Sequence, residues 1–557
     1  MAGLVVGIVA LPLAIAFAIA ASPGGDAEHT IGPGIGILTA IVAGLIISLL
    51  GGSRIQIGGP TGAFIVIIYG IVAKFGLSGL LVATILAGVM LVLMGVFRLG
   101  SVIKFIPYPI VVGFTSGIAL TIFTTQVKDL LGLTLEGGAP AAFIDKWMCY
   151  FRNITTLQWD AVAVSAVSIA IIVACTRWMK RLPGSLIAII VTTATVYFTN
   201  QSGLTHVATI GDRFGNITAS LPHINAFHLD WKSLFTDAQG HFTFNTLSAL
   251  LPSAFVIAIL GAIESLLSAT VADGVTGDHH DSNQELIGQG IANIVAPFFG
   301  GIPATGAIAR TMTNINNGAR TCIAGVVHAL VLLIIFIVAM PLAAYIPMPT
   351  LAGVLVVVSY NMSQWRTFAQ LTHRPKSDVV VLLVTFVLTV VFDLTIAIEL
   401  GLVLACLLFM RRMAEVTQLS IFTKEIDPNA DPVADIPLHE EALVIPDGVE
   451  VYEINGPFFF GVANRFEEMT AEMQDHPAIR IIRMRRVPFI DSTGVHNLEN
   501  LCLMSQRDGT QIILSGVQPK VRAVLERAGF PALIGEDNIC SHITLALERA
   551  AVLRYKS

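Results

Sequence analysis

One carboxylate inside an apolar segment is the residue best suited to chemistry. Glu264 stands in the run Ala262–Ser268, where its neighbours are alanine, isoleucine, leucine and serine. A carboxylate at membrane depth is costly and usually functional. Because burial disfavours the charged form, Glu264 could exchange a proton or bind a cation; the alternative is a structural hydrogen bond between helices. Ser268 follows one turn later and can share the same helix face.

Two glycine-rich segments point to a binding site. Gly300–Arg310 reads GGIPATGAIAR, and Gly58–Phe64 reads GGPTGAF, so a Thr-Gly-Ala tripeptide recurs 244 positions apart. In transporters, paired Gly/Pro-interrupted segments in two halves of a chain mark the binding site. Helices that begin inside the membrane direct free N–H groups and a positive dipole end at the ligand. The pair therefore favours a bound anion.

Polar and aromatic side chains near these segments could take part in binding. The hydroxyl groups of Thr61 and Thr305 could donate hydrogen bonds to the ligand, or cap the broken helices. Arg310 could supply positive potential, pair with Glu264, or form a structural ion pair. Phe17, in the first apolar run, could line the pocket or simply pack against other helices.

The composition indicates a membrane domain, which would hold these residues, followed by a soluble domain. Of 557 residues, 54% are hydrophobic and 13% charged, and the mean hydropathy is +0.77. This is a membrane protein. However, 34 of the 70 charged side chains follow Met413. We therefore expect a membrane domain at 1–413, a linker at 414–438 and a soluble domain at 439–557.

The same composition excludes several classes. The six cysteines are scattered without a CxxC pair, and the sequence contains no P-loop or zinc motif, so we expect no metal, no cofactor and no enzyme. No basic run suggests nucleic acid as a partner. His279 and His280 lie in a polar loop, where we expect them to be solvated. The first apolar run lacks a positively charged start, which favours a first span over a signal peptide; we expect a short native segment to precede it.

The membrane domain divides into two similar halves. We count fourteen spans, at about 2–21, 32–50, 59–74, 77–97, 105–126, 159–177, 184–199, 246–272, 285–299, 304–317, 322–346, 349–364, 377–393 and 394–411. Because seven is odd, two tandem seven-span repeats, at about 1–200 and 246–412, must have opposite topology. Lys and Arg gather on the side of the termini, which places both termini in the cytoplasm.

The tail alternates strands and helices. Strands are expected at 449–454, 479–484 and 511–515, with helical patterns between and after them, which indicates a small α/β domain. Asp491-Ser492-Thr493-Gly494 follows a strand and opens a helix. Ser492 could carry a phosphate that the helix N-terminus would stabilise, although an ordinary N-cap explains the motif equally well.

Taken together, these motifs resemble the sulfate permease (SulP) family and its relatives in solute carrier family 26. The motifs that support this resemblance are Ala10-Leu11-Pro12, Gly58–Thr61, Val112–Gly117 (VGFTSG), Gly261–Leu267 (GAIESLL), Gly288–Gly301 (GQGIANIVAPFFGG) and Gly306–Thr311 (GAIART). The tail with DSTG resembles a STAS domain. The resemblance covers essentially the whole chain.

The resemblance implies an all-α fold of fourteen spans with core and gate domains, followed by the STAS domain. The anion would lie between the N-termini of half-helices three and ten and move by an elevator mechanism. On this resemblance Thr61, Gly62 and Ala63 would face Gly306, Ala307 and Ile308 across the site, and Phe17 and Leu13 would approach it. With Thr305 and Arg310 as further binding candidates and Glu264 and Ser268 as the proton-coupling pair, these are the expected site residues. The resemblance further implies a homodimer in the bacterial inner membrane and a cytoplasmic STAS domain. It also implies acyl carrier protein as a partner of the STAS domain, because similar tails are associated with that protein.

Two positions bear on the subtype. Sodium-coupled bicarbonate transporters of the family carry Asp where Glu264 stands and Thr where Ile308 stands, and Ile308 offers Na⁺ no oxygen. The chain is most similar to the proton-coupled C4-dicarboxylate type (succinate, fumarate). Bicarbonate or sulfate transport with H⁺ or Na⁺, an anion channel, a nucleobase permease and a membrane-tethered STAS signalling protein are the alternatives.

Overall fold

The computed structural model resolves the chain into two compact units, Met1–Val403 and Leu404–Ser557, which are described separately. It describes residues 1–22, 30–103, 107–135, 140, 142–178, 183–215, 245–392, 394–426, 443–462 and 477–556.

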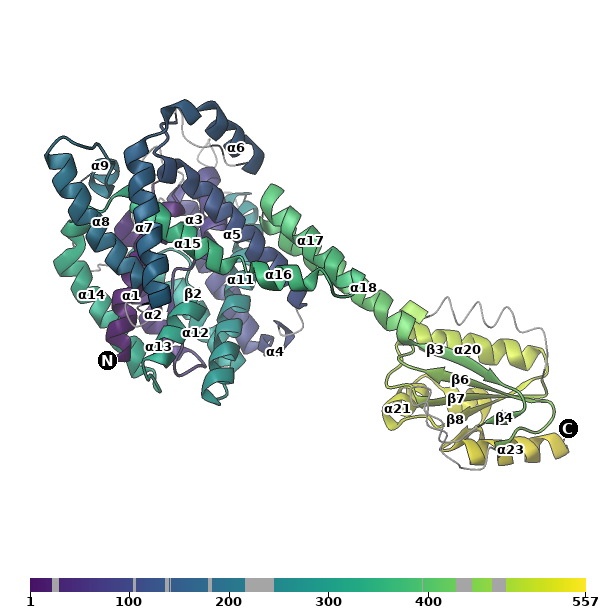
Figure 1. Cartoon of the computed structure of the whole chain (residues 1–557). Coiled ribbons are helices and arrows are strands. Elements are labelled where there is room, and N and C mark those ends of the chain that lie inside the picture. The colour runs from purple at the N-terminus through teal and green to yellow at the C-terminus, as the bar shows by residue number, and fades with distance from the viewer. Residues whose placement is uncertain are drawn as a thin grey trace. The chain divides into compact units, whose positions relative to one another are not determined.

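Helices make up nearly all of the first unit (Figure 1). Its first half contains α1 (Ala2–Ala20), α2 (Pro33–Leu50), η2 (Gly62–Phe64), α3 (Ile65–Val96), α4 (Gly100–Ile103), α5 (Tyr108–Leu131), α6 (Phe143–Arg152), η3 (Ile154–Thr156), α7 (Trp159–Trp178), α8 (Gly184–Gln201) and α9 (Ile210–Phe214). The second contains α11 (Asn245–Thr276), α12 (Ser282–Val295), η4 (Ala296–Phe299), α13 (Ile308–Asn316), α14 (Ile323–Ala343), α15 (Met348–Met362), α16 (Trp365–Leu371), α17 (Lys376–Val391) and α18 (Leu394–Val416), which continues into the second unit.

These helices confirm the fourteen predicted spans. Each expected segment coincides with a helix or part of one, and the segments at 59–74 and 77–97 form a single helix kinked at Gly76. Gly76 has φ 66°, a left-handed conformation that glycine adopts without steric cost. In the described part of the chain, seven helices are long and apolar enough to cross a membrane, and the broken helices α12 and α13 are shorter.

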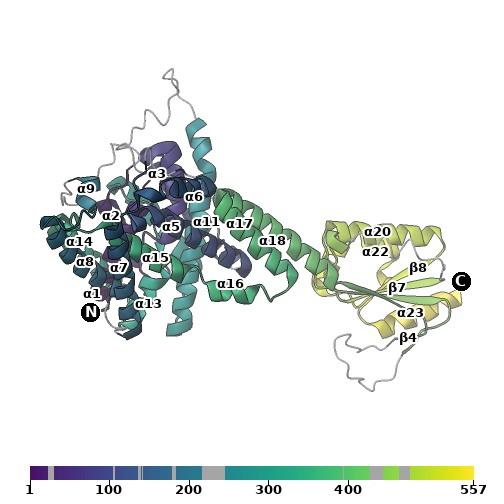
Figure 2. The same ribbon diagram turned by 45° about the horizontal axis from the view of Figure 1, so that its top comes forward.

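By their contacts, the helices of this unit, which Figure 2 shows from a second side, form two packed groups. In the core group, α1, α2, α3, α11, α12, α13 and α14 pack on one another; in the gate group, α5, α7, α8, α15 and α17 do so. Glycine permits the closest approaches within the core group, where α3 and α12 cross. A Cβ on Gly88 would lie 2.7 Å from the carbonyl oxygen of Gly290, so larger residues would force these helices apart.

A short antiparallel ladder joins the two halves of the unit. β1 (Gly58–Gly59) pairs with β2 (Thr305–Gly306), with Gly58 opposite Gly306 and Gly59 opposite Thr305. The two segments that share the Thr-Gly-Ala tripeptide are therefore hydrogen-bonded to each other. This contact is the centre of the seven-plus-seven arrangement.

The second unit is the α/β domain expected from the tail. Its sheet has the order β3-β6-β7-β8-β9, formed by β3 (Gln418–Phe422), β6 (Val449–Asn455), β7 (Ile479–Arg486), β8 (Gln511–Ser515) and β9 (Ile539–Cys540). β3 is antiparallel to β6, and the remaining neighbours are parallel. Other elements are β4 (Glu425–Ile426), β5 (Leu443–Val444), η5 (Phe460–Val462), α20 (Ser492–Arg507), α21 (Pro519–Arg527), α22 (Phe530–Ile534), η6 (Glu536–Asn538) and α23 (Ile543–Lys556).

The three predicted strands are confirmed as β6, β7 and β8. The structure also places β3 and β4 within 414–438, the range expected to be a linker. In β3, Gln418–Phe422 pairs with β6 along its whole length, so its backbone groups are satisfied by the sheet. The sheet thus begins before the predicted domain boundary.

Candidate functional site

Two helices begin at the β1–β2 ladder, each without a capping side chain. η2 and α3 start after Thr61, and α13 starts after Ala307; neither of these N-cap residues makes a side-chain cap hydrogen bond. The first N–H groups of a helix have no partner within it and need one from elsewhere. Their dipole ends are also positive. The two starts therefore provide free donors that suit an anion.

Glu264 of α11 reaches one of these starts. The hydroxyl of Thr61 donates a hydrogen bond of 2.8 Å to Oε2 of Glu264. Among the described residues, Glu264 forms no ion pair, and this is its only hydrogen bond. A carboxylate held within a helix bundle without a cation is best stabilised by taking up a proton. The structure thus brings together two residues that the sequence singled out separately.

Thr305 lies inside the ladder rather than at a helix start. It is fully buried, and its hydroxyl contacts the carbonyl oxygen of Gly261 at 2.9 Å and Oγ of Ser265 at 2.7 Å. Ser265 also accepts a 3.0 Å hydrogen bond from the N–H of Gly306. These bonds fasten β2 to α11, so the hydroxyl of Thr305 is engaged in structure while that of Thr61 faces the carboxylate.

Ser268 has a similar bracing contact. Its hydroxyl donates to Oγ1 of Thr311 at 3.2 Å, and the same oxygen accepts from the N–H of Ile57 at 3.1 Å. Ser268 therefore ties α11 to α13, and it shows no hydrogen bond to Glu264. Its predicted part in proton coupling has no direct contact to support it.

Arg310 of α13 is 2% exposed and points to the opposite half of the ladder. Its Nη2 donates a 2.9 Å hydrogen bond to the carbonyl oxygen of Pro60, while Nη1 is buried without a partner. It forms no ion pair with Glu264. Gly59 has φ 148° and lies against the guanidinium group, so a side chain at that position would be both strained and obstructed. Arg310 thus holds its positive charge beneath the two helix starts.

Apolar side chains of both helix groups surround Gly62. A Cβ on Gly62 would lie 2.9 Å from Sδ of Met362, 3.4 Å from the ring of Phe17 and 3.5 Å from Cδ1 of Ile122. Phe17 belongs to the core group, and Ile122 and Met362 belong to the gate group. Gly62 therefore lies at the boundary between the groups.

The remaining expected residues are distributed around this boundary. Ala63 is buried in η2, Gly306 is buried in β2, Ala307 is the N-cap of α13, and Ile308 is 40% exposed at its first turn. Leu13 packs against the gate-group cluster of Ile172, Ala188 and Val354 as well as against the core. Among the expected residues, Thr61 contacts Glu264, and Phe17 lies beside Gly62.

A second carboxylate in this unit was not anticipated. Glu285 of α12 is fully buried, but its oxygens accept hydrogen bonds from the N–H of Ser53 at 3.2 Å and from Nε2 of Gln289 at 2.8 Å. Glu285 is therefore satisfied by the fold itself. Glu264, with one hydroxyl donor, is less fully satisfied than Glu285.

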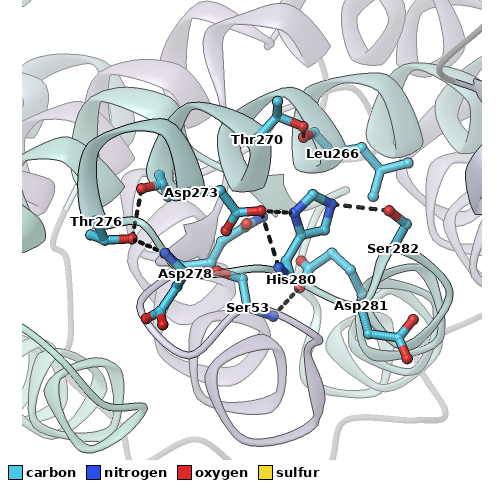
Figure 3. Close-up of polar contacts among 12 residues, drawn as sticks. Ser53, Leu266, Thr270, Asp273, Thr276, Asp278, His280, Asp281 and Ser282 are labelled. Atoms are coloured by element: carbon cyan, nitrogen blue, oxygen red, sulfur yellow. Dashed lines mark hydrogen bonds and ion pairs between the residues drawn. The ribbon is translucent and has the colours of Figure 1, made fainter.

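Figure 3 shows a further polar cluster between α11 and α12. Nδ1 of His280 lies 2.6 Å from Oδ2 of Asp273, and Nε2 lies 3.0 Å from Oγ of Ser282. The expectation that His280 is solvated is wrong: its side chain is 5% exposed, whereas His279 is exposed. The order of contacts resembles a Ser-His-Asp relay, but it surrounds the helix start that Asp281 caps. We interpret it as the connection between these helices.

In the second unit, the DSTG motif forms a helix start. Oδ1 of Asp491 accepts from the N–H of Gly494 at 2.8 Å, and Oδ2 accepts from the N–H of Phe460 at 3.1 Å. Ser492 is the first residue of α20 and is exposed. Asp491 thus provides the N-cap, and Ser492 is accessible at the surface.

The fold and the site define a transporter of the inverted-repeat class. Its two helix starts meet at the β1–β2 ladder of the first unit, Met1–Val403, which is called the membrane unit below. Comparison with known proteins gives the family. The family model "Sulfate permease family" matches residues 1–385, and the STAS domain model matches residues 442–548. The chain belongs to the sulfate permease family, whose members transport anions, and it carries a C-terminal STAS domain.

Individual relatives agree with this assignment. "Putative sulfate transporter YvdB" of Bacillus subtilis is 38% identical over 97% of this chain and 95% of its own length. The bicarbonate transporter BicA of Picosynechococcus is 29% identical over 94% of this chain and 89% of its own length. The murine anion transporter Slc26a9 in its inward-facing state has the same fold, with a TM-score of 0.82 over 99% of this chain and 90% of that chain at 19% identity. These relatives are transporters and not enzymes.

Proposed function

We propose that this protein is a proton-coupled symporter of a small oxyanion, with Glu264 as the proton carrier. The observation that carries the proposal is the 2.8 Å hydrogen bond from Thr61 to Glu264, directly beside an uncapped helix start. An anion bound to the free N–H groups would bring negative charge close to this carboxyl group. Protonation of Glu264 would remove the repulsion, so binding of the proton and of the anion would favour each other.

Proton coupling is supported over sodium coupling by the residues at the second helix start. Na⁺ requires several oxygen ligands, and Ile308, exposed at the first turn of α13, supplies none. Thr305 does not compensate, because its hydroxyl is bonded to Gly261 and Ser265. A carboxyl group with one hydroxyl neighbour is better suited to a proton.

The chemistry of the helix starts and the names of similar proteins limit the class of substrate. The helix starts can bind any small oxyanion through backbone N–H groups, which recognise charge more than shape. Sulfate and bicarbonate are the anions in the names of similar proteins. C4-dicarboxylates such as succinate are the third candidate. The argument for them is the combination of residue types described above, with Glu at position 264 and Ile at position 308.

An elevator mechanism fits the division into core and gate groups. Both helix starts, Glu264 and Arg310 belong to the core group, so the binding site would move with it past the gate residues Ile122 and Met362. We further propose that both termini and the STAS domain face the cytoplasm of a bacterium, in accord with the Lys/Arg distribution. A homodimer and an acyl carrier protein partner at the STAS domain are supported by the family resemblance.

The proposal is tested by uptake into proteoliposomes. Purified full-length protein is supplied with radiolabelled sulfate, bicarbonate or succinate under an inward H⁺ gradient, an inward Na⁺ gradient, or neither. Accumulation of at least one anion under the H⁺ gradient alone is expected. Accumulation that requires Na⁺, or that ignores both gradients, would reject proton symport.

A further inference from the structure

A small cavity lined by cations lies at the end of the membrane unit opposite the N-terminus, where Figure 1 shows α6. Its volume is about 50 Å³, and its polar lining comprises Ser22, Tyr69, Thr125, Gln126, Lys128, Asp129, Lys146, Tyr150 and Arg213. A water molecule needs roughly 10–15 Å³ of such space, so the cavity has room for several waters or for one small oxyanion.

Lys146 is the residue that distinguishes this cavity from an ordinary polar surface. It belongs to the short amphipathic helix α6, is 3% exposed and lines the cavity. Its ammonium group lies 4.8 Å from the ring centroid of Tyr69 and has no hydrogen bond or ion pair with any described residue. Burial lowers the pKa of Lys146 to about 8, so the side chain is still mainly a cation at neutral pH. A buried cation without a carboxylate partner calls for an anion.

The surrounding charges also favour an anion. The lining contains three basic side chains, Lys128, Lys146 and Arg213, against one carboxylate, Asp129. Asp129 lies 3.4 Å from Arg213 and is engaged by it. Lys128 has no ion pair among the described residues, but the charge of Asp129 acts on it as well as on Arg213. One carboxylate therefore faces three basic side chains, and the small space keeps an excess of positive charge.

The cavity lies in line with the central site. Three segments that meet around Gly62 continue to the cavity. They are α1 from Phe17 to Ile19, η2 with α3 from Gly62 to Tyr69, and α5 from Ile122 to Thr125. Tyr69 follows Gly62 by seven residues, which corresponds to about 10 Å along a helix. The cavity and the central site are therefore separated by one to two helical turns, along the boundary between core and gate groups.

We propose that Lys146, together with Lys128, forms an outer binding site at which the transported oxyanion docks before it reaches the helix starts. The proposal rests on the anion transport proposed above. The site lies on the side that the topology places outside the cell. It raises the local anion concentration at the entrance and serves influx rather than efflux. Its occupant is a soluble oxyanion, because the lining encloses Lys146 and leaves this residue only 3% exposed.

The first test compares the two directions of transport. In right-side-out vesicles, Lys146→Gln is expected to raise the KM for influx of radiolabelled sulfate, bicarbonate or succinate about tenfold, the usual loss for one charge-assisted contact, with Vmax unchanged. In inside-out vesicles the KM should not change. Lys146→Arg should retain most of the affinity. Lys74→Gln, which removes an exposed lysine from α3, is the matched control and should leave both directions unchanged.

An unchanged influx KM in Lys146→Gln would overturn the proposal. An equal rise in both directions would also overturn it, because Lys146 would then act on the central site. If the wild-type protein transports none of the three anions, the proposed function fails, and binding decides the outer site separately.

For that purpose, equilibrium binding of radiolabelled sulfate is measured on Gly62→Val in phosphatidylcholine nanodiscs, since a side chain at Gly62 obstructs the central site. Binding that Lys146→Gln removes supports the outer site, and absence of binding rejects it. Loss of sulfate binding when phosphatidylglycerol is added would show that a lipid phosphate occupies the cavity, which would overturn a soluble occupant.

Discussion

Ser265 offers a quantitative test of how the site is held together. Ser265→Ala removes the contact with Thr305 and leaves the N–H of Gly306 without an acceptor, in a place where Ser265 and Thr305 are fully buried. A buried unsatisfied donor costs about 1–3 kcal/mol, and the lost hydroxyl contact adds about 1 kcal/mol. The free energy of unfolding should therefore fall by about 2–4 kcal/mol.

Ser268→Ala is the matched control on the same helix. It removes one hydrogen bond to Thr311, whose oxygen still accepts from Ile57, so a loss of about 1 kcal/mol is expected. Unfolding is followed by tryptophan fluorescence during denaturant titration in detergent. All five tryptophans precede residue 404, so the signal reports the membrane unit alone. A loss for Ser268→Ala that equals or exceeds the loss for Ser265→Ala would refute the reasoning.

Two further predictions concern the central site and the STAS domain. Gly62→Val should reduce anion uptake to below about a tenth of wild type, because its Cβ would lie 2.9 Å from Sδ of Met362 and close to Phe17. The fluorescence titration should show a folded protein that has lost no more than about 1–3 kcal/mol of stability; uptake at the wild-type rate would contradict the position of the site. In the STAS domain, burial raises the pKa of Cys502 to about 12, so the folded domain holds this proton more tightly than the unfolded chain. The stabilisation is complete below about pH 9 and declines between pH 9 and 12; it should be absent in Cys502→Ala, and parallel pH profiles of stability for the two proteins would contradict it.

Much of the architecture could be predicted because it depends on local features. Apolar runs of sufficient length predicted the spans, and the repeated tripeptide predicted a symmetrical pair of broken helices, which the pairing of Gly59 with Thr305 joins directly. The division of Met1–Val403 into core and gate groups came only from the family resemblance, since span lengths do not say which helices pack together.

The roles of individual side chains were harder to predict, because they depend on contacts distant in sequence. Thr61 and Thr305 occupy equivalent places in the tripeptides, yet one faces Glu264 and the other braces β2. Helical spacing favoured Ser268 as the neighbour of Glu264, whereas Ser265 makes the more important contacts with the ladder.

The placement of other residues could not be predicted from the sequence. Ile122 and Met362 are ordinary apolar residues in separate spans, and only the packing of α5 and α15 against Gly62 reveals them. His280 was expected in solvent because its loop is polar, but seven residues earlier Asp273 supplies a partner that draws the ring inward. Short-range composition does not report such long-range contacts.

The most direct test of the central claim is the proton flux that accompanies anion uptake in Glu264→Gln. Proteoliposomes containing a pH-sensitive dye are exposed to an anion that the wild-type protein accumulates, with no imposed pH gradient. The account predicts internal acidification with the wild-type protein, and anion exchange without acidification in Glu264→Gln, because the amide keeps the contact with Thr61 but cannot carry a proton. Acidification at the wild-type rate in this variant would contradict the assignment of Glu264 as the proton carrier.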